Sequence, residues 1–229
     1  SSISVKIYLL LIIIYSRIAY MKKIFLLVPV CFIVIHVFSV AFAGKLIVTS
    51  GVQEVKKENK YKKAYFAGGC FWCMEESFDK IEGVVKSISG YSGGHLKNPS
   101  YRDVIYKDTG HVEAIEITYD PKKINYNKLL NIFWRNIDPF DQFGQFCDKG
   151  KSYRSVVFFQ NKKQNKIIKE SLKSIEKKFN SKVVTLTWKF EKFYPAEDYH
   201  QDYYQKNFLK YLAYKKACQR EEVLDKIWN

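Results

Sequence analysis

Segments with strand-like and helix-like patterns alternate from residue 63 to residue 218, and this order limits the folds open to the chain. Strand patterns occupy 63–67, 84–91, 112–119, 153–159 and 183–193. Helical spacing of apolar residues occupies 70–80, 125–137, 165–179 and 201–218. The first six elements match a split βαβ unit. We therefore predict an α+β fold, a ferredoxin-like mixed sheet backed by helices, in a single domain with a C-terminal helical extension.

An N-terminal apolar run stands apart from this pattern. The segment has the pattern of a secretory signal peptide. Two lysines follow Met21, an uncharged apolar stretch runs from Ile24 to Val40, and an Ala-Phe-Ala sequence ends at Ala43. An uncleaved membrane anchor is the alternative, because the run is nearly long enough to span a bilayer. The predicted parts are upstream sequence at 1–20, the signal peptide at 21–43, a flexible leader at 44–60 and the folded domain at 61–229. A cleaved signal predicts a periplasmic or secreted protein.

The positive charge is large, but the lysines that carry it are scattered rather than gathered in blocks. The first 43 residues hold four cations and no acid, which leaves +11 of the formal +15 for the rest of the chain. Because these lysines are scattered among Tyr and Asn, they predict a solvated basic surface rather than a nucleic-acid groove. A hydrophobic fraction of 47% supplies a core and excludes a disordered chain.

The first chemically informative motif is a cysteine placed directly after a glycine pair. The strand at 63–67 ends in Gly68-Gly69, and Cys70 opens the next helix. Unpaired N–H groups and the helix dipole favour a thiolate at that place, so we expect a lowered pKa for Cys70. Cys73 follows one helical turn later, within reach of a disulfide. A structural disulfide or half of a zinc site is the alternative, although Cys147 and Cys218 have no close Cys neighbour to complete a zinc site.

At these residues the sequence resembles the class A peptide methionine sulfoxide reductases, and the likeness covers nearly all of 62–215. The resemblance is carried by several motifs in order: Gly69-Cys70-Phe71-Trp72, Gly90-Tyr91-Ser92-Gly93-Gly94, Asn98-Pro99-Ser100-Tyr101, Thr109-Gly110-His111-Val112-Glu113, Asp148-Lys149-Gly150 with Tyr153-Arg154-Ser155, and Ala196-Glu197-Asp198-Tyr199-His200-Gln201. It implies that 61–229 is a catalytic domain that reduces the S epimer of methionine sulfoxide, free or in proteins, with no cofactor and no metal.

The resemblance also assigns roles to single residues. Cys70 would attack the sulfoxide sulfur, and Glu113 would supply the proton, which requires a carboxyl pKa raised by burial. The hydroxyls of Tyr101 and Tyr153 would hold the sulfoxide oxygen. The aromatic faces of Phe71 and Trp72 would receive the S-methyl group. Asp148 would help to anchor the substrate. We expect structural roles for His111 and His200, and a solvated side chain at Glu116, which alternation places on the opposite strand face from Glu113.

The cysteine that resolves the resulting sulfenic acid is left open by the sequence. Many family members have Gly at the position of Cys73 and a Gly-rich C-terminal tail with the resolving cysteine, whereas this chain has no such tail. The candidates, in order, are Cys73, Cys218 and Cys147. Thiol–disulfide exchange with a thioredoxin-like reductant would then restore the thiols.

Two other functions also fit parts of the sequence. A Cys-x-x-Cys motif at a helix start is typical of thioredoxin-type oxidoreductases, although that fold needs a cis-proline loop for which only Pro121 stands at a plausible distance. The net charge would suit a basic binding module for acidic surfaces. We expect a monomer whose only membrane contact is the N-terminal segment.

Overall fold

The computed structural model describes residues 60–229, and the upstream segment, signal peptide and leader predicted within 1–59 lie outside the described residues. The strands and helices follow in this order: β1 (Lys62–Ala67), α2 (Phe71–Asp79), β2 (Val84–Ser92), α3 (Tyr101–Tyr106), β3 (Val112–Tyr119), α4 (Tyr126–Arg135), β4 (Gly144–Gln145), β5 (Asp148–Lys149), β6 (Val156–Phe159), α5 (Lys162–Phe179), β7 (Leu186–Lys189), β8 (Phe193–Pro195), α6 (Tyr203–Lys206), α7 (Phe208–Ala217) and α8 (Arg220–Trp228). Short 3-10 turns occupy Lys151–Tyr153 and Asp198–His200.

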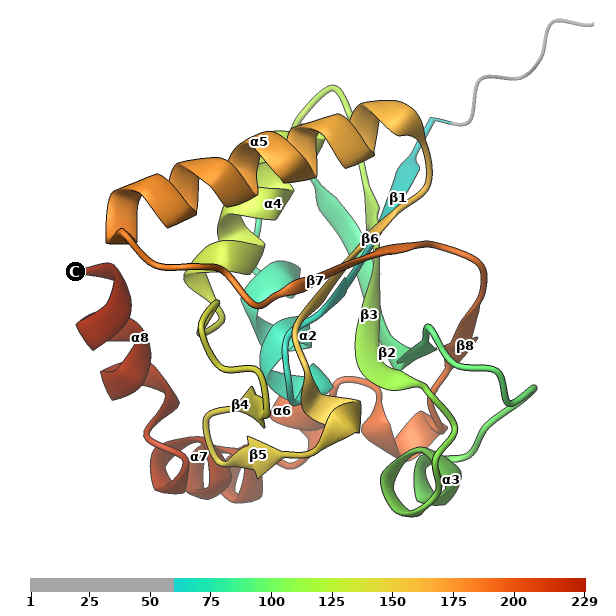
Figure 1. Ribbon diagram of the computed structural model, residues 1–229. Helices are drawn as coiled ribbons and strands as arrows, with labels where there is room; N and C mark the ends of the chain where they lie inside the picture. The colour runs from blue at the N-terminus through green and yellow to red at the C-terminus, as the bar shows by residue number, and fades with distance from the viewer. Residues whose placement is uncertain (1–59) are drawn as a thin grey trace, which may run out of the picture. The chain divides into compact units, whose positions relative to one another are not determined.

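The main sheet has six strands in the order β7-β6-β1-β3-β2-β8 (Figure 1). β1 pairs antiparallel with both β3 and β6, and β3 pairs antiparallel with β2. These four strands have the order and directions of a split βαβ unit, which confirms the predicted ferredoxin-like α+β fold. β7 adds parallel to β6 at one edge, and β8 adds antiparallel to β2 at the other. The hairpin β4–β5 forms a separate small sheet.

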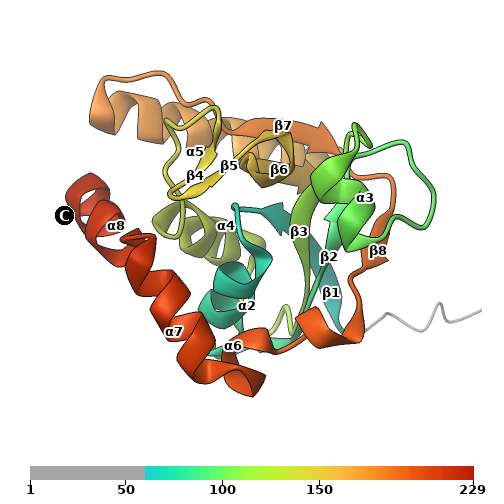
Figure 2. The ribbon, with the colours of Figure 1, turned by 90° about the horizontal axis from the view of Figure 1, so that it is seen from below.

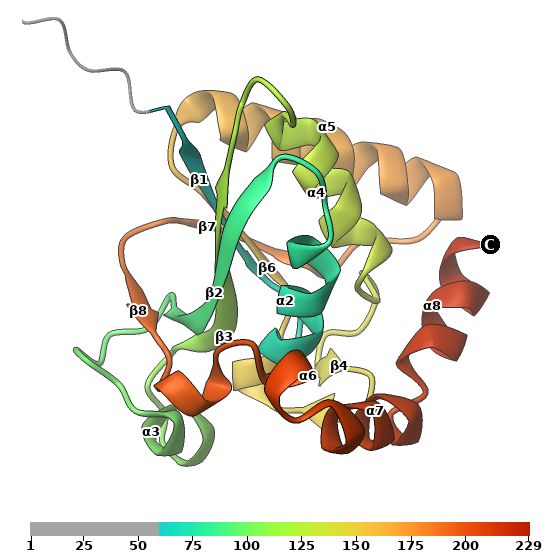
Figure 3. The ribbon, with the colours of Figure 1, turned by 180° about the vertical axis from the view of Figure 1, so that it is seen from behind.

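Helices cover one face of the sheet, where the larger core forms. Side chains from β1 and β3 meet those of α2, α4 and α5 there, as Figure 3 shows for α2 and α4. Its largest fully buried members are Tyr91, Phe66, Phe71, Phe78, Phe133, Met74, Ile115, Ile117, Leu129, Leu130 and Ile137. The alternate residues of β1 and β3, among them Tyr65 and Ala114, enter a smaller cluster on the other face, which Trp188 and Phe193 cover. β3 is therefore buried on both faces.

The C-terminal part of the chain differs from the sequence prediction. The helix expected over 201–218 is divided into α6 and α7 at Asn207, whose backbone angles (φ −125°, ψ 41°) are not helical. Gln219, at a φ of +51°, then separates α7 from α8. The strand expected over 183–193 is two strands, β7 and β8, which lie at opposite edges of the sheet. None of the helices between residues 60 and 229 has both the length and the apolar character of a membrane span.

Candidate active site

The turn between β1 and α2 places Cys70 at the start of the helix, as the sequence predicts. Cys70 is the N-cap residue of α2, and its carbonyl accepts the N–H groups of Cys73 and Met74 at 3.2 and 3.3 Å. Gly69 adopts a φ of +77°, a region that side chains with a Cβ rarely occupy. A Cβ on Gly69 would lie 2.5 Å from the Cβ of Gln145. The turn therefore has no room for a side chain at position 69.

Glu113 lies at the same helix start, on the face of β3 that points toward α2. Its Oε2 accepts the backbone N–H of Phe71, the residue after Cys70, at 3.0 Å. Only 2% of Glu113 is exposed, and this burial raises the pKa of the carboxyl well above its usual range, against the opposing effect of the Phe71 N–H. Glu113 can therefore keep its proton near neutral pH, next to the cysteine.

Glu116 is the other acidic residue of β3, and its predicted solvation is wrong. It is buried on the opposite face of the sheet, where its carboxylate accepts hydrogen bonds from Tyr65 at 2.8 Å and from Lys63 at 2.7 Å. Two carboxylates of one strand thus have different surroundings, and only Glu113 lies at the cysteine.

Cys70 and Cys73 form a buried pair of free thiols, with exposed fractions of 4% and 2%. Burial, followed by the hydrogen bond to Cys73, raises the pKa of Cys70, which corrects the expectation of a lowered value. The hydrogen bond from Cys70 lowers the pKa of Cys73 to about 6. The first thiolate of the pair therefore resides on Cys73, because desolvation of Cys70 outweighs the field of the helix start.

Aromatic rings enclose the pair on the side of α2. Trp72 stacks on Tyr203 with ring centroids 3.8 Å apart, and its indole N–H donates to Nδ1 of His200 at 3.2 Å. Burial lowers the pKa of His200 to about 4, so the ring is neutral and also contacts Phe71 at 4.9 Å between centroids. The histidine thereby orients the two aromatic residues that the resemblance assigns to the methyl group.

Tyr101 and Tyr153 come from α3 and from the turn before β6, and both lie near Glu113. Burial raises the pKa of each hydroxyl, and a negative charge on Glu113, once that carboxyl ionises, raises both further. The Tyr101 ring also packs against His200, 4.6 Å between centroids. Two neutral hydroxyls thus accompany the protonated carboxyl, although the three residues are up to 52 positions apart in the chain.

The β4–β5 hairpin contributes Asp148, which the structure connects to the site through Tyr214. The hydroxyl of Tyr214 donates to Oδ2 of Asp148 at 2.5 Å, and Tyr214 also packs against the cluster that contains Cys70 and Cys73. Tyr203, Tyr211 and Tyr214 of the C-terminal helices all line this cluster. The sequence contains 17 tyrosines, and these three belong to none of its motifs, so no signal singled them out.

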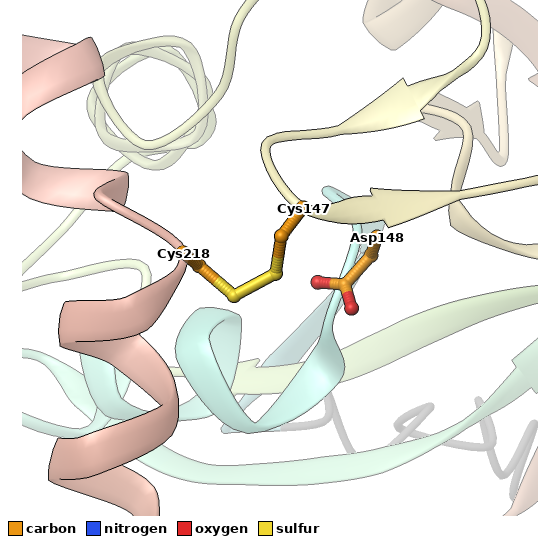
Figure 4. Close-up of side chains that lie close together, drawn as sticks. All are labelled: Cys147, Asp148 and Cys218. Atoms are coloured by element: carbon orange, nitrogen blue, oxygen red, sulfur yellow. A yellow bond between two sulfur atoms is a disulfide. The ribbon is translucent and has the colours of Figure 1, made fainter.

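Cys147 and Cys218 form a disulfide, with Cα atoms 5.0 Å apart (Figure 4). The bond joins the β4–β5 hairpin to the C-cap residue of α7. Of the three cysteines proposed to resolve a sulfenic acid, only Cys73 is therefore a free thiol in this structure, and it is also the one paired with Cys70. Two sulfurs of the alternative four-thiolate zinc site are bonded to each other.

Comparison with known proteins matches the chain to one family. The model of the family described as "Peptide methionine sulfoxide reductase" matches residues 62–229. A peptide methionine sulfoxide reductase MsrA of Listeria innocua is 47% identical over 170 residues, which cover 73% of this chain and 96% of the relative. The corresponding protein of Bacillus licheniformis is 46% identical, with 74% and 95% covered.

Solved structures agree with this match. The reduced form of Mxr1 from Saccharomyces cerevisiae has a TM-score of 0.61 and 32% identity, over 65% of this chain and 86% of that one. Methionine sulfoxide reductase A of Corynebacterium diphtheriae has a TM-score of 0.60 and 26% identity, over 66% and 77%. A fold with a buried cysteine and a buried carboxyl at one helix start defines a class of thiol-dependent reductases. Within it, the chain belongs to the peptide methionine sulfoxide reductase family, in its MsrA class.

Proposed function

We propose that the protein reduces the S epimer of methionine sulfoxide, free or in proteins, through attack by Cys70 and protonation by Glu113. One observation supports this most: the carboxyl of Glu113 accepts the N–H of the residue that follows Cys70. Nucleophile and acid therefore share one buried site, and an aromatic pair stands beside them. A sulfoxide bound there meets a sulfur nucleophile and a proton donor together.

The first step begins with a proton transfer between the two cysteines. In the resting pair the hydrogen bond runs from Cys70 to Cys73, and movement of its proton to Cys73 gives a Cys70 thiolate. This thiolate attacks the sulfoxide sulfur while Glu113 gives its proton to the oxygen. Transfer of that hydroxyl to Cys70 leaves methionine and a Cys70 sulfenic acid. Methionine sulfoxide gains two electrons, and Cys70 loses them.

The second step uses Cys73 as the resolving cysteine. Its thiol attacks the Cys70 sulfenic acid, which forms a Cys70–Cys73 disulfide and releases the hydroxyl as water. Three observations support Cys73 as the resolving cysteine. Cys73 is buried beside Cys70, it is a free thiol, and Cys147 and Cys218 are already bonded to each other. Exchange with a thioredoxin-like dithiol then returns both thiols.

The substrate's three groups have separate partners, and this arrangement supports selection of one epimer. Phe71 and Trp72 would hold the methyl group. Tyr101, Tyr153 and Glu113 would hold the oxygen. Asp148 would hold the rest of the substrate. We assign the protein to repair of oxidised methionine under oxidative stress. We also propose that it acts as a monomer outside the cytoplasm, with 21–43 as its export signal or anchor.

An epimer assay tests the activity. With dithiothreitol as reductant, the purified chain should reduce the S sulfoxide and leave the R epimer unchanged. Cys70→Ser should abolish the reaction, because it removes the thiol that directly precedes the N–H bound by Glu113. Methionine produced from each epimer is measured by chromatography. Equal turnover of both epimers would contradict the assigned specificity, and activity in Cys70→Ser would contradict the nucleophile.

A donor assay tests the resolving cysteine. With thioredoxin, thioredoxin reductase and NADPH in place of dithiothreitol, Cys73→Ser should produce about one methionine per enzyme and then stop. Cys147→Ser and Cys218→Ser, as matched controls, should continue to turn over. If Cys218→Ser or Cys147→Ser stops after one turnover while Cys73→Ser continues, the resolving role belongs to that residue instead.

A further inference from the structure

Helix α7 covers the catalytic cysteines, and its tyrosines face them. Tyr211 and Tyr214 stand three residues apart, so they lie on the same side of the helix. Both pack against the cluster that contains Cys70 and Cys73, and α7 passes close to α2 in the view from below (Figure 2). The helix is therefore a wall of the site, although it contributes no motif residue.

Tyr214 contacts three groups that already have proposed roles. Its hydroxyl donates to Oδ2 of Asp148 at 2.5 Å, its ring meets the Trp72 ring edge-on at 6.0 Å between centroids, and it packs against the cluster that contains Cys70 and Cys73. A single side chain thus connects the substrate anchor, the methyl-binding ring and the nucleophile. A tyrosine that only filled space would not need its hydroxyl on the Asp148 carboxylate.

The disulfide holds both ends of the Tyr214–Asp148 hydrogen bond. Cys147 directly precedes Asp148 in the chain, and its sulfur bonds to that of Cys218 (Figure 4). Cys218 is one helical turn after Tyr214, and its N–H donates to the Tyr214 carbonyl at 3.0 Å. The hydrogen bond and the disulfide therefore close one small ring. Cys147 is exposed, so a dithiol in solution can reach this bond.

We propose that Tyr214 is a positioning residue for the bound sulfoxide, and that the Cys147–Cys218 disulfide holds it against Asp148. The inference rests on the proposed function, because it concerns the substrate anchor of that site. A dithiol that reduces the disulfide gives it two electrons and two protons and becomes oxidised to a disulfide itself. The two resulting thiols release α7 from the hairpin, and the Tyr214–Asp148 contact loses its covalent support.

The charges around Asp148 give a signature of this role. Burial raises the pKa of Asp148, and the Tyr214 hydroxyl opposes this rise, as do the nearby cations Arg220 and Lys149. Without the hydroxyl, the pKa of Asp148 rises further. If binding needs the ionised carboxylate, then on acidification the binding of Tyr214→Phe should begin to weaken at a higher pH than the binding of the background protein. A tyrosine that only packs would leave this pH dependence unchanged.

A binding assay on the full chain tests the proposal. In a Cys70→Ser, Cys73→Ser background, Cys147–Cys218 is the only disulfide-forming pair between residues 60 and 229. Calorimetry with a peptide that contains the S sulfoxide should show about tenfold weaker binding for Tyr214→Phe, the loss expected for a hydrogen bond to a charged group. Dithiothreitol should weaken binding about fivefold in the background protein, and by less than twofold once Tyr214→Phe is present.

Controls separate this role from general destabilisation. Tyr106→Phe, a tyrosine 77% exposed on α3, should bind as the background does. Unchanged binding in Tyr214→Phe, or equal losses on reduction with and without Tyr214, would overturn the inference while the wild-type chain still reduced the sulfoxide. A wild-type chain that reduces no sulfoxide would overturn the proposed function as well. A pH dependence of binding that is the same in Tyr214→Phe and the background would leave only a packing role.

Discussion

Burial raises the pKa of both Glu113 and Cys70, which helps the proposed role of Glu113 and hinders that of Cys70. It raises the pKa of Glu113, which keeps the proton that the proposed reaction gives to the sulfoxide oxygen. It also raises the pKa of Cys70, which disfavours the thiolate. The thiolate of Cys73 raises the pKa of Cys70 further, so a Cys70 thiolate forms only as its proton passes to Cys73. At the scale of residues, the Cys-x-x-Cys spacing thus supplies a base for the nucleophile.

Glu113→Gln should slow sulfoxide reduction by about 100-fold or more, the usual range for loss of a general acid. The carboxyl must be protonated to act, and its pKa is raised, so the wild-type rate should be maintained near neutral pH. It should fall as the pH rises through the pKa of Glu113. Gln does not titrate, so this decline should disappear. Rates with dithiothreitol at a series of pH values measure both effects.

Glu116→Gln is the matched control, because it changes the same residue type on the same strand but on the other face of the sheet. Its rate and its pH profile should match those of the wild type. If Glu113→Gln keeps a rate within threefold of the wild type, or if both variants lose the decline, then Glu113 is not the acid.

The sequence located Cys70 at a helix start but could not give the direction of its pKa shift. Helix position is a local property that the glycine pair and the apolar spacing reveal. Desolvation depends on α7, whose tyrosines come from a segment more than 130 residues away. The same limit explains Glu116, whose partners Lys63 and Tyr65 stand on a different strand.

At the scale of elements, the turn from β1 to α2 is a tightly constrained connection in the site. Gly69 has both a positive φ and a close neighbour in the β4–β5 hairpin. Strands and helices with strong periodicity, such as β3 over 112–119, lie where the sequence predicts them. The two-residue strands of the hairpin are too short to show a pattern, and α6 and α7 separate through one non-helical residue that polar composition does not mark.

Gly69→Ala should destabilise the fold by about 2–4 kcal/mol, from the strained φ together with the overlap on Gln145. It should also lower sulfoxide reduction, because any relief of that overlap moves Cys70 or the hairpin that carries Asp148. Urea unfolding measures the first effect and the dithiothreitol assay the second. Gly150→Ala provides the comparison, since its φ is +124° but a Cβ there meets nothing within 4 Å. Equal losses of stability in the two variants would show that the overlap with Gln145 is unimportant.

At the scale of the whole molecule, the fold brings together residues from the two ends of the domain. The order of the first six predicted elements was sufficient to derive the β6-β1-β3-β2 arrangement, because a split βαβ unit has one strand order. The motifs of the family supplied the candidate site residues of α2, α3 and β3. The pairing of Cys147 with Cys218 and the wall formed by α7 could not be derived, since both depend on how the C-terminal helices pack against the hairpin.

Trapping of the first intermediate tests the central claim most directly. The reduced Cys73→Ser chain is freed of dithiothreitol and mixed with one equivalent of the S sulfoxide and dimedone, a reagent that captures sulfenic acids. Peptide mass spectrometry then locates the adduct. The account predicts one dimedone adduct, on Cys70, together with about one methionine per chain. When the same chain also carries Glu113→Gln, it predicts no adduct over the same short time. Methionine production with the adduct on another cysteine, or with no adduct, would contradict it.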